Sequence, residues 1–319
     1  MMRARARFSI QIVLAALCLA VSAEGQAPDC GFCGTSESLL PVSSTSWTLR
    51  KEVNEVQVLF TASHDGKFVN GLAREDIAVR DNGKPASILD FRGQDNVPLR
   101  IALLVDTSDS IRKRFEFEKK TAAMFLRQTL RSEADQAMIA GFNTRLHMTQ
   151  DFSHDSRALS AGLARLAPGG GTAVFDAVAE ACRMLARPQE GVVARVLILV
   201  SDGDDNESKI TREAAIAAAQ QSDVTVYALS TGYHAGDLDG DRNLKHLALP
   251  TGGHAMFPGA VRKLASAFER ISEELRHRYV LAYRPAEFAA NGRFHRIQIQ
   301  ARKSGKKLKV RARKGYYAR

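Results

Sequence analysis

The chain has 319 residues, of which 45% are hydrophobic and 25% charged, and its formal net charge is +10. This apolar content is enough for a packed core, which excludes a disordered or fibrous protein, and the length suggests about two domains. Four cysteines are too few for a disulfide scaffold in a chain of this size.

The first segment predicts export. Three arginines precede an apolar run at 10–20, and small residues follow at the cleavage position, Val21, Ser22 and Ala23. This order is typical of a secretory signal peptide, and the apolar run is short for a membrane-spanning helix. We expect a signal peptide at 1–23 and a location in the periplasm, at the cell surface or outside the cell. A retained N-terminal anchor is the alternative.

The next segment, 24–46, is expected to be a flexible tail with a C-x-x-C pair. Cys30 and Cys33 lie in a Gly/Ser-rich stretch without a preceding strand, whereas a thioredoxin-like site needs the pair at a strand-to-helix junction. We expect a local disulfide in an oxidising compartment. Half a zinc site is the alternative, although no second pair completes it.

Alternating apolar residues predict β-strands near both ends of the chain, in segments 47–97 and 279–319. In the first segment, Asp81-Asn82-Gly83-Lys84 is a strong hairpin signal, with strands expected at 77–80 and 87–91. About forty residues are too few to fold stably alone. We therefore expect the two segments to pair in one small antiparallel β-sandwich, with the middle of the chain inserted between them.

The last part of the chain is strongly basic. From Asn291 to Arg319 there are eleven Lys and Arg residues and no acidic ones. Such a block can attract polyanions on a cell envelope, such as anionic glycans or lipid head groups. The simpler interpretation is a set of solvated strand faces whose charges discourage aggregation. Nucleic acid is not expected as a partner. Export would separate the protein from the nucleic acids of the cell, and no aromatic residues suited to stacking on bases alternate with the charges.

The middle segment, 98–278, alternates predicted strands and helices. The runs 101–105 and 196–200 are continuously apolar, as in strands buried on both faces. Further strands are expected at 136–142, 145–149 and 224–229, and helices at 115–130, 156–166, 174–185, 212–221 and 261–276. The first helix has Phe117, Met124, Phe125 and Leu130 among its apolar positions. This order predicts an α/β fold with a doubly wound, mostly parallel sheet, whose ligands gather beyond the carboxyl ends of the strands.

Three polar clusters are expected at that edge. Asp106-Thr107-Ser108-Asp109-Ser110 follows the first buried strand, Gly169-Gly170-Gly171-Thr172 leads into a helix, and Ser201-Asp202-Gly203-Asp204 follows the second buried strand. The clusters offer carboxylate and hydroxyl oxygens but no His or Cys, which suits hard cations such as Mg²⁺, Mn²⁺ or Ca²⁺ and not zinc. Asp106, Ser108 and Ser110 alternate, so one loop can aim all three at a single point.

These clusters, in this order, resemble the metal-ion-dependent adhesion site of von Willebrand factor type A (VWA) domains, over roughly 99–278. The wider chain resembles acidobacterial-type VWFA-related secreted proteins, with features that include Pro98-Leu99-Arg100-Ile101 and Lys314-Gly315-Tyr316-Tyr317.

The resemblance implies a divalent cation, Mg²⁺ first, held by Asp106, Ser108, Ser110, Thr172 and Asp202. Both serine hydroxyls would bind the ion, the two carboxylates would hold it directly or through water, and Thr172 would do either, depending on conformational state. One coordination position would stay open for a carboxylate from a partner protein.

Asp109 departs from the family pattern, which commonly has glycine there. Its charge either tightens the metal or repels an acidic partner, and Asp204 and Asp205 add negative charge close by. A second acidic run, 237–243, begins like a calcium loop but has Arg242 and Ala248 where an EF-hand needs Gly and Glu. We expect a solvated loop there, with a calcium site as the alternative.

Motifs of a phosphate loop, a zinc protease or a serine hydrolase are absent from the sequence. We therefore expect an exported, non-enzymatic protein-binding module with no catalytic residues. One alternative is a structural envelope protein that binds polyanions through its basic C-terminal hairpin. The other is a metal-dependent hydrolase, for which Asp109 is the only evident general base.

Overall fold

The computed structural model describes residues 55–93, 97–109, 115–189, 191–232 and 239–318. The signal peptide expected at 1–23, the cysteine pair Cys30 and Cys33, and Ser110 lie outside these residues. In the part of the chain that is described, no helix has the length and apolarity needed to span a membrane.

A six-stranded sheet with the order β11-β10-β9-β6-β7-β8 organises the middle of the chain. Neighbouring strands are parallel, except that β7 and β8 are antiparallel. The strands are β6 (Leu99–Asp106), β7 (Gln136–Phe142), β8 (Leu146–Ser153), β9 (Ala194–Ser201), β10 (Val224–Ser230) and β11 (Ala255–Met256). The expected α/β fold with a mostly parallel sheet is confirmed.

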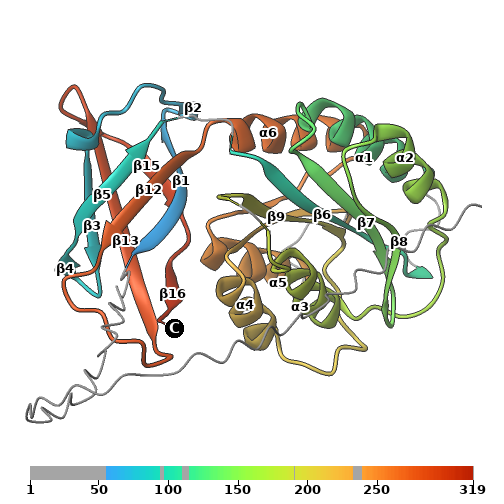
Figure 1. The fold of residues 1–319 in the computed structure, drawn as a ribbon. Helices are drawn as coiled ribbons and strands as arrows, with labels where there is room; N and C mark the ends of the chain where they lie inside the picture. The colour runs from blue at the N-terminus through green and yellow to red at the C-terminus, as the bar shows by residue number, and fades with distance from the viewer. Residues whose placement is uncertain (1–54, 94–96, 110–114, 190, 233–238, 319) are drawn as a thin grey trace, which may run out of the picture. The chain divides into compact units, whose positions relative to one another are not determined.

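Both faces of this sheet are covered by helices (Figure 1). One face carries α1 (Phe115–Thr129), α2 (Ser156–Ala164) and α6 (Leu264–Arg276), and the other carries α3 (Val174–Leu185), α4 (Arg212–Gln221) and α5 (Asp239–Ala248). Strand β6 supplies both cores, because Leu103 and Val105 pack into the first and Ala102 and Leu104 into the second. Because both faces of β6 are covered, its residues are apolar at successive positions and do not alternate with polar ones.

Side-chain caps set where two of the helices begin. The Asp155 carboxylate accepts a hydrogen bond from Arg157 N (2.8 Å) before α2, and Thr211 Oγ1 accepts one from Ala214 N (3.2 Å) before α4. Each cap satisfies a backbone N–H that the first helical turn cannot pair internally.

The buried stripe of α1 differs from the apolar positions named from sequence. Phe117 and Met124 are 40% and 42% exposed, whereas Phe115, Phe125 and Leu126 are buried. At 3.6 residues per turn, the buried positions share one face of the helix, and Phe117 and Met124 lie off it.

The solvated loop expected over 237–243 is wrong from Asp239 onward, because α5 begins there. Leu244, Leu247 and Ala248 recur at helical spacing and are buried in the second core. Asp239 and Asp241 fall in the first turn, where negative charge favours a helix. The acidic residues that suggested a loop therefore support the start of a helix.

Two antiparallel sheets combine strands from both ends of the described chain (Figure 1). The first, with the order β15-β1-β12-β5 and β2 paired to β1, contains β1 (Val56–His64), β2 (Lys67–Phe68), β5 (Ser87–Arg92), β12 (Tyr279–Arg284) and β15 (Lys309–Ala312). The second, with the order β14-β13-β3-β4 and β16 paired to β13, contains β3 (Ile77–Asp81), β4 (Lys84–Pro85), β13 (Phe294–Lys303), β14 (Lys306–Lys307) and β16 (Gly315–Tyr317). They enclose one apolar core that includes Phe60, Val79 and Ile297, which confirms the antiparallel sandwich.

The hairpin after β3 has the expected turn but a different return strand. Asn82 and Gly83 have positive φ angles of 47° and 81°, and Asp81 pairs with Lys84. The short return strand β4 ends at Pro85, and Ala86 N makes one further bond to Val79 O (3.0 Å). The segment expected to return, now β5, pairs instead with β12 in the other sheet.

A buried polar network joins α6 to β15. The Glu274 carboxylate, 2% exposed, accepts hydrogen bonds from Tyr227 Oη (2.9 Å) and Arg311 Nη1 (2.8 Å). Arg311 also donates to His254 Nδ1 (2.7 Å). Because a guanidinium group can only donate, Nδ1 accepts this bond and carries no proton. Because a buried carboxylate needs such partners, this network fixes the last helix to the sandwich.

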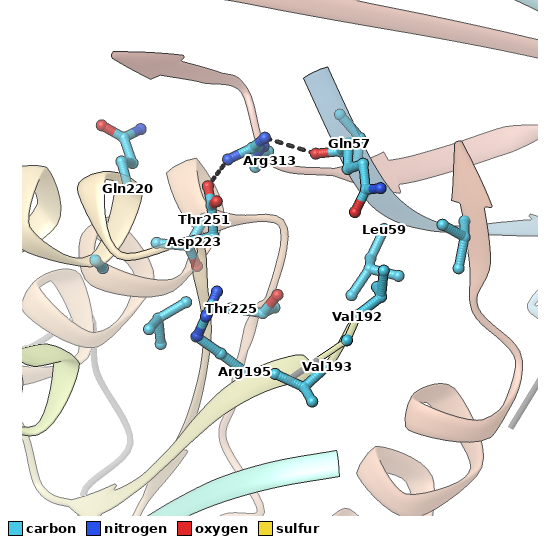
Figure 2. A pocket seen from close by; sticks show the side chains of 15 residues that line it. Gln57, Leu59, Val192, Val193, Arg195, Gln220, Asp223, Thr225, Thr251 and Arg313 are labelled. Carbon is cyan, nitrogen blue, oxygen red and sulfur yellow. Dashed lines mark hydrogen bonds and ion pairs between the residues drawn. The ribbon is translucent and has the colours of Figure 1, made fainter. Parts of the chain in front are cut away.

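A second basic residue of the C-terminal stretch is also used structurally. Arg313 pairs with Asp223, in the turn between α4 and β10, and donates to Gln57 O in β1 (2.7 Å) (Figure 2). Burial lowers the pKa of Arg313 to about 10. Part of the basic block therefore holds the fold together and is not available to a partner.

We predict that Glu274→Ala lowers the free energy of unfolding by about 2–3 kcal/mol, because it leaves the buried Tyr227 hydroxyl and Arg311 without their acceptor. Urea denaturation measures the effect. Glu269→Ala, on an exposed position of the same helix, is the matched control and should change stability by less than about 0.5 kcal/mol. Equal effects of the two substitutions would contradict the role assigned to Glu274.

Stability should also fall in mild acid because of His254. Burial lowers the pKa of this side chain to about 4, below the ordinary value of about 6.5. The unfolded chain therefore takes up a proton that the folded chain refuses, so stability present above about pH 6.5 is lost as the pH falls toward about 4. His254→Gln should flatten the stability profile in this window, and His154→Gln, at an exposed position, should leave it unchanged.

Candidate metal centre

The candidate site begins where the strand order of the parallel sheet reverses. Strands β6 and β9 are neighbours, but the chain continues from β6 to β7 on one side and from β9 to β10 on the other. Loops that leave the carboxyl ends of such strands diverge and leave a space between them. Asp106 ends β6, and Ser201 ends β9.

Asp106 is fully buried at this point. Its Oδ1 accepts a hydrogen bond from Ser108 N (2.8 Å), and its Oδ2 accepts one from Ser201 Oγ (2.7 Å). Burial raises the pKa of Asp106 to about 6, and the charge of Asp202 raises it further, while the hydrogen bonds from Ser201 and Ser108 oppose the shift. Among the described residues, the Asp106 carboxylate is thus hydrogen-bonded by the neutral groups of Ser108 and Ser201, and Asp202 adds a second negative charge nearby.

The loop after β6 is tied to the glycine loop before α3. Thr107 O accepts from Gly169 N (2.6 Å), and Gly170 O accepts from Asp109 N (3.3 Å). In return, Gly170 N donates to the Asp109 carboxylate (3.4 Å). Asp109 therefore helps to position the glycine loop, in addition to the charge that it adds near the site.

The glycine loop is also tied to the loop after β9. Thr172 N donates to Asn206 Oδ1 (2.9 Å), and Thr172 O accepts from the backbone N of both Asn206 (3.0 Å) and Glu207 (3.1 Å). Asp205 accepts from Val174 N (2.7 Å) at the start of α3. The sequence marked Asp205 only as extra negative charge, whereas the structure uses that charge to cap a helix.

Helix α5 brings an unexpected acid to the same rim. Gly203 has a positive φ of 83°, and a side chain on either Gly203 or Gly240 would collide with the backbone of the other segment. This close approach places Asp241 near Asp204, whose pKa is raised by burial and by the charges of Asp202 and Asp241. The helical spacing of the leucines in α5 was the sequence signal that could have located Asp241.

Four of the five expected ligands are among the described residues, at the end of β6 or in the loops that these hydrogen bonds hold together: Asp106, Ser108, Thr172 and Asp202. Ser110 lies outside the described residues. The described residues contain no group of three or more His, Cys, Asp or Glu side chains placed to hold a metal ion. A cation here would depend on two carboxylates and on hydroxyl oxygens, a donor set that suits Mg²⁺, Mn²⁺ or Ca²⁺. The buried Asp106 fits such a role, because a cation would offset the cost of burying its charge.

A pocket with a partly apolar lining lies elsewhere in the described residues. A cavity of about 160 Å³ opens at the amino-terminal ends of β9 and β10, and its lining includes Val193, Arg195, Thr225 and Arg313 (Figure 2). None of the expected metal ligands lines it. The candidate centre lies at the opposite edge of the sheet, at the carboxyl ends of the strands, where Asp106, Ser108 and Thr172 are buried.

Three solved structures are similar to this chain. Von Willebrand factor type A from Catenulispora acidiphila has 12% identity to this chain and a TM-score of 0.50, covering 78% of this chain and 73% of its own. The protein BatB from Bacteroides thetaiotaomicron has 20% identity, 56% and 97% coverage and a TM-score of 0.46. The von Willebrand factor domain of a type V pilus tip protein from Porphyromonas gingivalis has 16% identity, 56% and 95% coverage and a TM-score of 0.47.

At 12% identity, the likeness to the Catenulispora acidiphila protein shows a shared fold and nothing about function. Curated protein sequences gave no match. The family model of the von Willebrand factor type A domain matches residues 101–270. Since this match spans more than half of the 319 residues, the chain belongs to the von Willebrand factor type A domain family.

Proposed function

We propose that this protein is an exported, non-enzymatic interaction module that binds a partner protein through a divalent cation, with Mg²⁺ as the first candidate. The observation that carries the proposal is the buried Asp106 carboxylate, which lies where three mutually hydrogen-bonded loops meet beside Asp202. Membership in the VWA family supports an interaction role.

The proposed ligands divide into two kinds of oxygen. Asp106 and Asp202 supply negative charge, and Ser108, Ser110 and Thr172 supply neutral hydroxyl groups. When bound, a divalent cation balanced by two carboxylates and neutral oxygens retains affinity for a further anionic oxygen. A carboxylate on the surface of a partner protein is the group that we propose for that position.

The hydrogen bonds of the site determine which oxygen of Asp106 faces which loop. Ser108 N holds Oδ1, and Ser201 Oγ holds Oδ2. The Ser108 hydroxyl also bonds this carboxylate. These donors still leave an acceptor position for a cation, since each carboxylate oxygen has two. Ser201 is thus a positioning residue that the resemblance alone did not assign.

The acidic rim makes partner binding depend on the cation. Asp202 and Asp241 both lie close enough to Asp204 to raise its pKa, and Asp109 contacts the glycine loop. Without a cation these charges repel an acidic partner. With a cation bound, the same charges limit the site to partners that present one well-placed carboxylate and little further negative charge.

The proposed export depends on the sequence of residues 1–23, with its basic start, apolar run and small residues at the cleavage position. The proposed location is the periplasm, the cell surface or the medium. Cys30 and Cys33 would form their disulfide in such an oxidising compartment.

We predict opposite effects of Asp106→Asn with and without Mg²⁺. In chelator, the substitution should raise the free energy of unfolding at neutral pH by about 1–2 kcal/mol, because it removes a buried charge. In Mg²⁺ at about a hundredfold excess over the dissociation constant, the wild type should gain about 2.7 kcal/mol, and the variant should gain nothing. Thermal melts with and without the ion measure both effects.

Asp65→Asn is the matched control, because Asp65 is an exposed aspartate in the sandwich. It should retain the full response to Mg²⁺. A wild type that shows no shift with Mg²⁺, Mn²⁺ or Ca²⁺, or a variant that shifts as much as the wild type, would remove the proposed site.

Partner capture tests the function itself. The full-length wild type should retain an envelope protein in Mg²⁺ and release it in chelator, while Asp106→Asn should fail to retain it in either buffer. Retention that is equal in both buffers, or equal for the two chains, would contradict cation-dependent binding. Turnover of a phosphoester or peptide substrate by the Mg²⁺-loaded chain would favour a hydrolase.

A further inference from the structure

One face of the sandwich sheet formed by β14, β13 and β3 carries a regular pattern of polar residues. Every second residue of β13 points to solvent, and these are Phe294, Arg296, Gln298, Gln300 and Arg302. The strand register places Arg80 opposite Gln298 and Lys307 opposite Arg302 on the same side. We call this set, together with Tyr317 beside Phe294, the basic face.

Among the solvent-facing residues of these three strands, none is acidic. The register even sets two cations against each other, since Arg302 pairs with Lys307. Like charges directly opposite on neighbouring strands destabilise a sheet. A polyanion bound along this face would relieve this repulsion.

The basic face is distinct from the basic residues that hold the fold together. Arg311 and Arg313 are paired with Glu274 and Asp223, and Lys303 donates to the backbone oxygen atoms of Asn70 (2.6 Å) and Gly71 (2.9 Å). By contrast, Arg296, Arg302 and Lys307 are exposed. The sequence alone could not separate these two groups.

An aromatic pair lies at one end of the basic face. Phe294 is 39% exposed, and its ring meets that of Tyr317 edge-on, with centroids 5.3 Å apart and an interplanar angle of 66°. Beside the pair is a hollow of about 580 Å³ that is also lined by Arg296 and Lys314. A side chain on Gly315 would collide with the Phe294 ring, so the glycine is what lets this ring lie against the strand.

We propose that the basic face binds an acidic polysaccharide in an extended conformation. The ten residues of β13 span about 30 Å, with cations near both ends and amide side chains between them. The guanidinium groups suit carboxylate or sulfate groups, the glutamine amides suit hydroxyl groups, and the aromatic pair offers an apolar surface to a sugar ring.

The composition of the face favours this partner over other polyanions. A membrane surface would call for several protruding apolar side chains, and the face has one aromatic pair at one end. A single-stranded nucleic acid would call for aromatic rings repeated along the groove to stack successive bases.

The test uses the full chain and four probes: polygalacturonate, neutral dextran, single-stranded DNA, and vesicles of phosphatidylglycerol and phosphatidylcholine. We expect binding to polygalacturonate that weakens at high salt, no binding to dextran, and weaker binding to the vesicles. The double variant Arg296→Gln/Arg302→Gln should lose affinity by about tenfold, from two surface charge contacts, and should fold normally because it relieves repulsion. Phe294→Ala should weaken binding separately while keeping its salt dependence.

The matched control is Arg127→Gln/Arg183→Gln, which removes the same charge from exposed helix positions. Equal loss in the two double variants would show a net-charge effect and overturn the proposal. Preference for the vesicles or for single-stranded DNA over polygalacturonate would overturn it as well. Chelator should leave this binding unchanged, so its outcome is independent of the proposed metal site.

Discussion

The proposed cation site depends on the complete burial of the Asp106 carboxylate at the end of the central strand β6, because burying a charged group is unfavourable in free energy. Its hydrogen bonds reach the loop after β6 and the end of β9, and those loops are bonded in turn to the glycine loop before α3. A buried acid held only by neutral donors beside another acid is destabilising unless a cation joins it. This arrangement is the basis of our proposal that the site binds a cation.

The two proposed binding surfaces have opposite charge and belong to different sheets. The rim of the parallel sheet gathers Asp202, Asp204 and Asp241, whereas the outer face of the sandwich gathers cations and lacks acids among its described strands. The network around Glu274 connects the two parts. Our two proposals therefore assign an envelope polymer to one part and a protein partner to the other.

Sequence patterns predicted the features that depend on local periodicity: the buried strands, most of the helices, and the order of the three polar loops. They did not predict what tertiary pairing decides. The acidic start of α5 concealed the helical spacing of Leu244 and Leu247, and β5 pairs with β12 of the other sheet instead of returning beside β3. Likewise, the cap by Asp205 joins residues about thirty positions apart, a separation that no local pattern records.

The most direct test of the central claim is a crystal structure of the protein with Mn²⁺, in which anomalous scattering locates the ion. Our account predicts one strong peak at bonding distance from oxygen atoms of the three loops, with Asp106 or a water molecule on it among the ligands. A peak held only by Asp204 and Asp241, or no peak at this rim in saturating Mn²⁺, would contradict it.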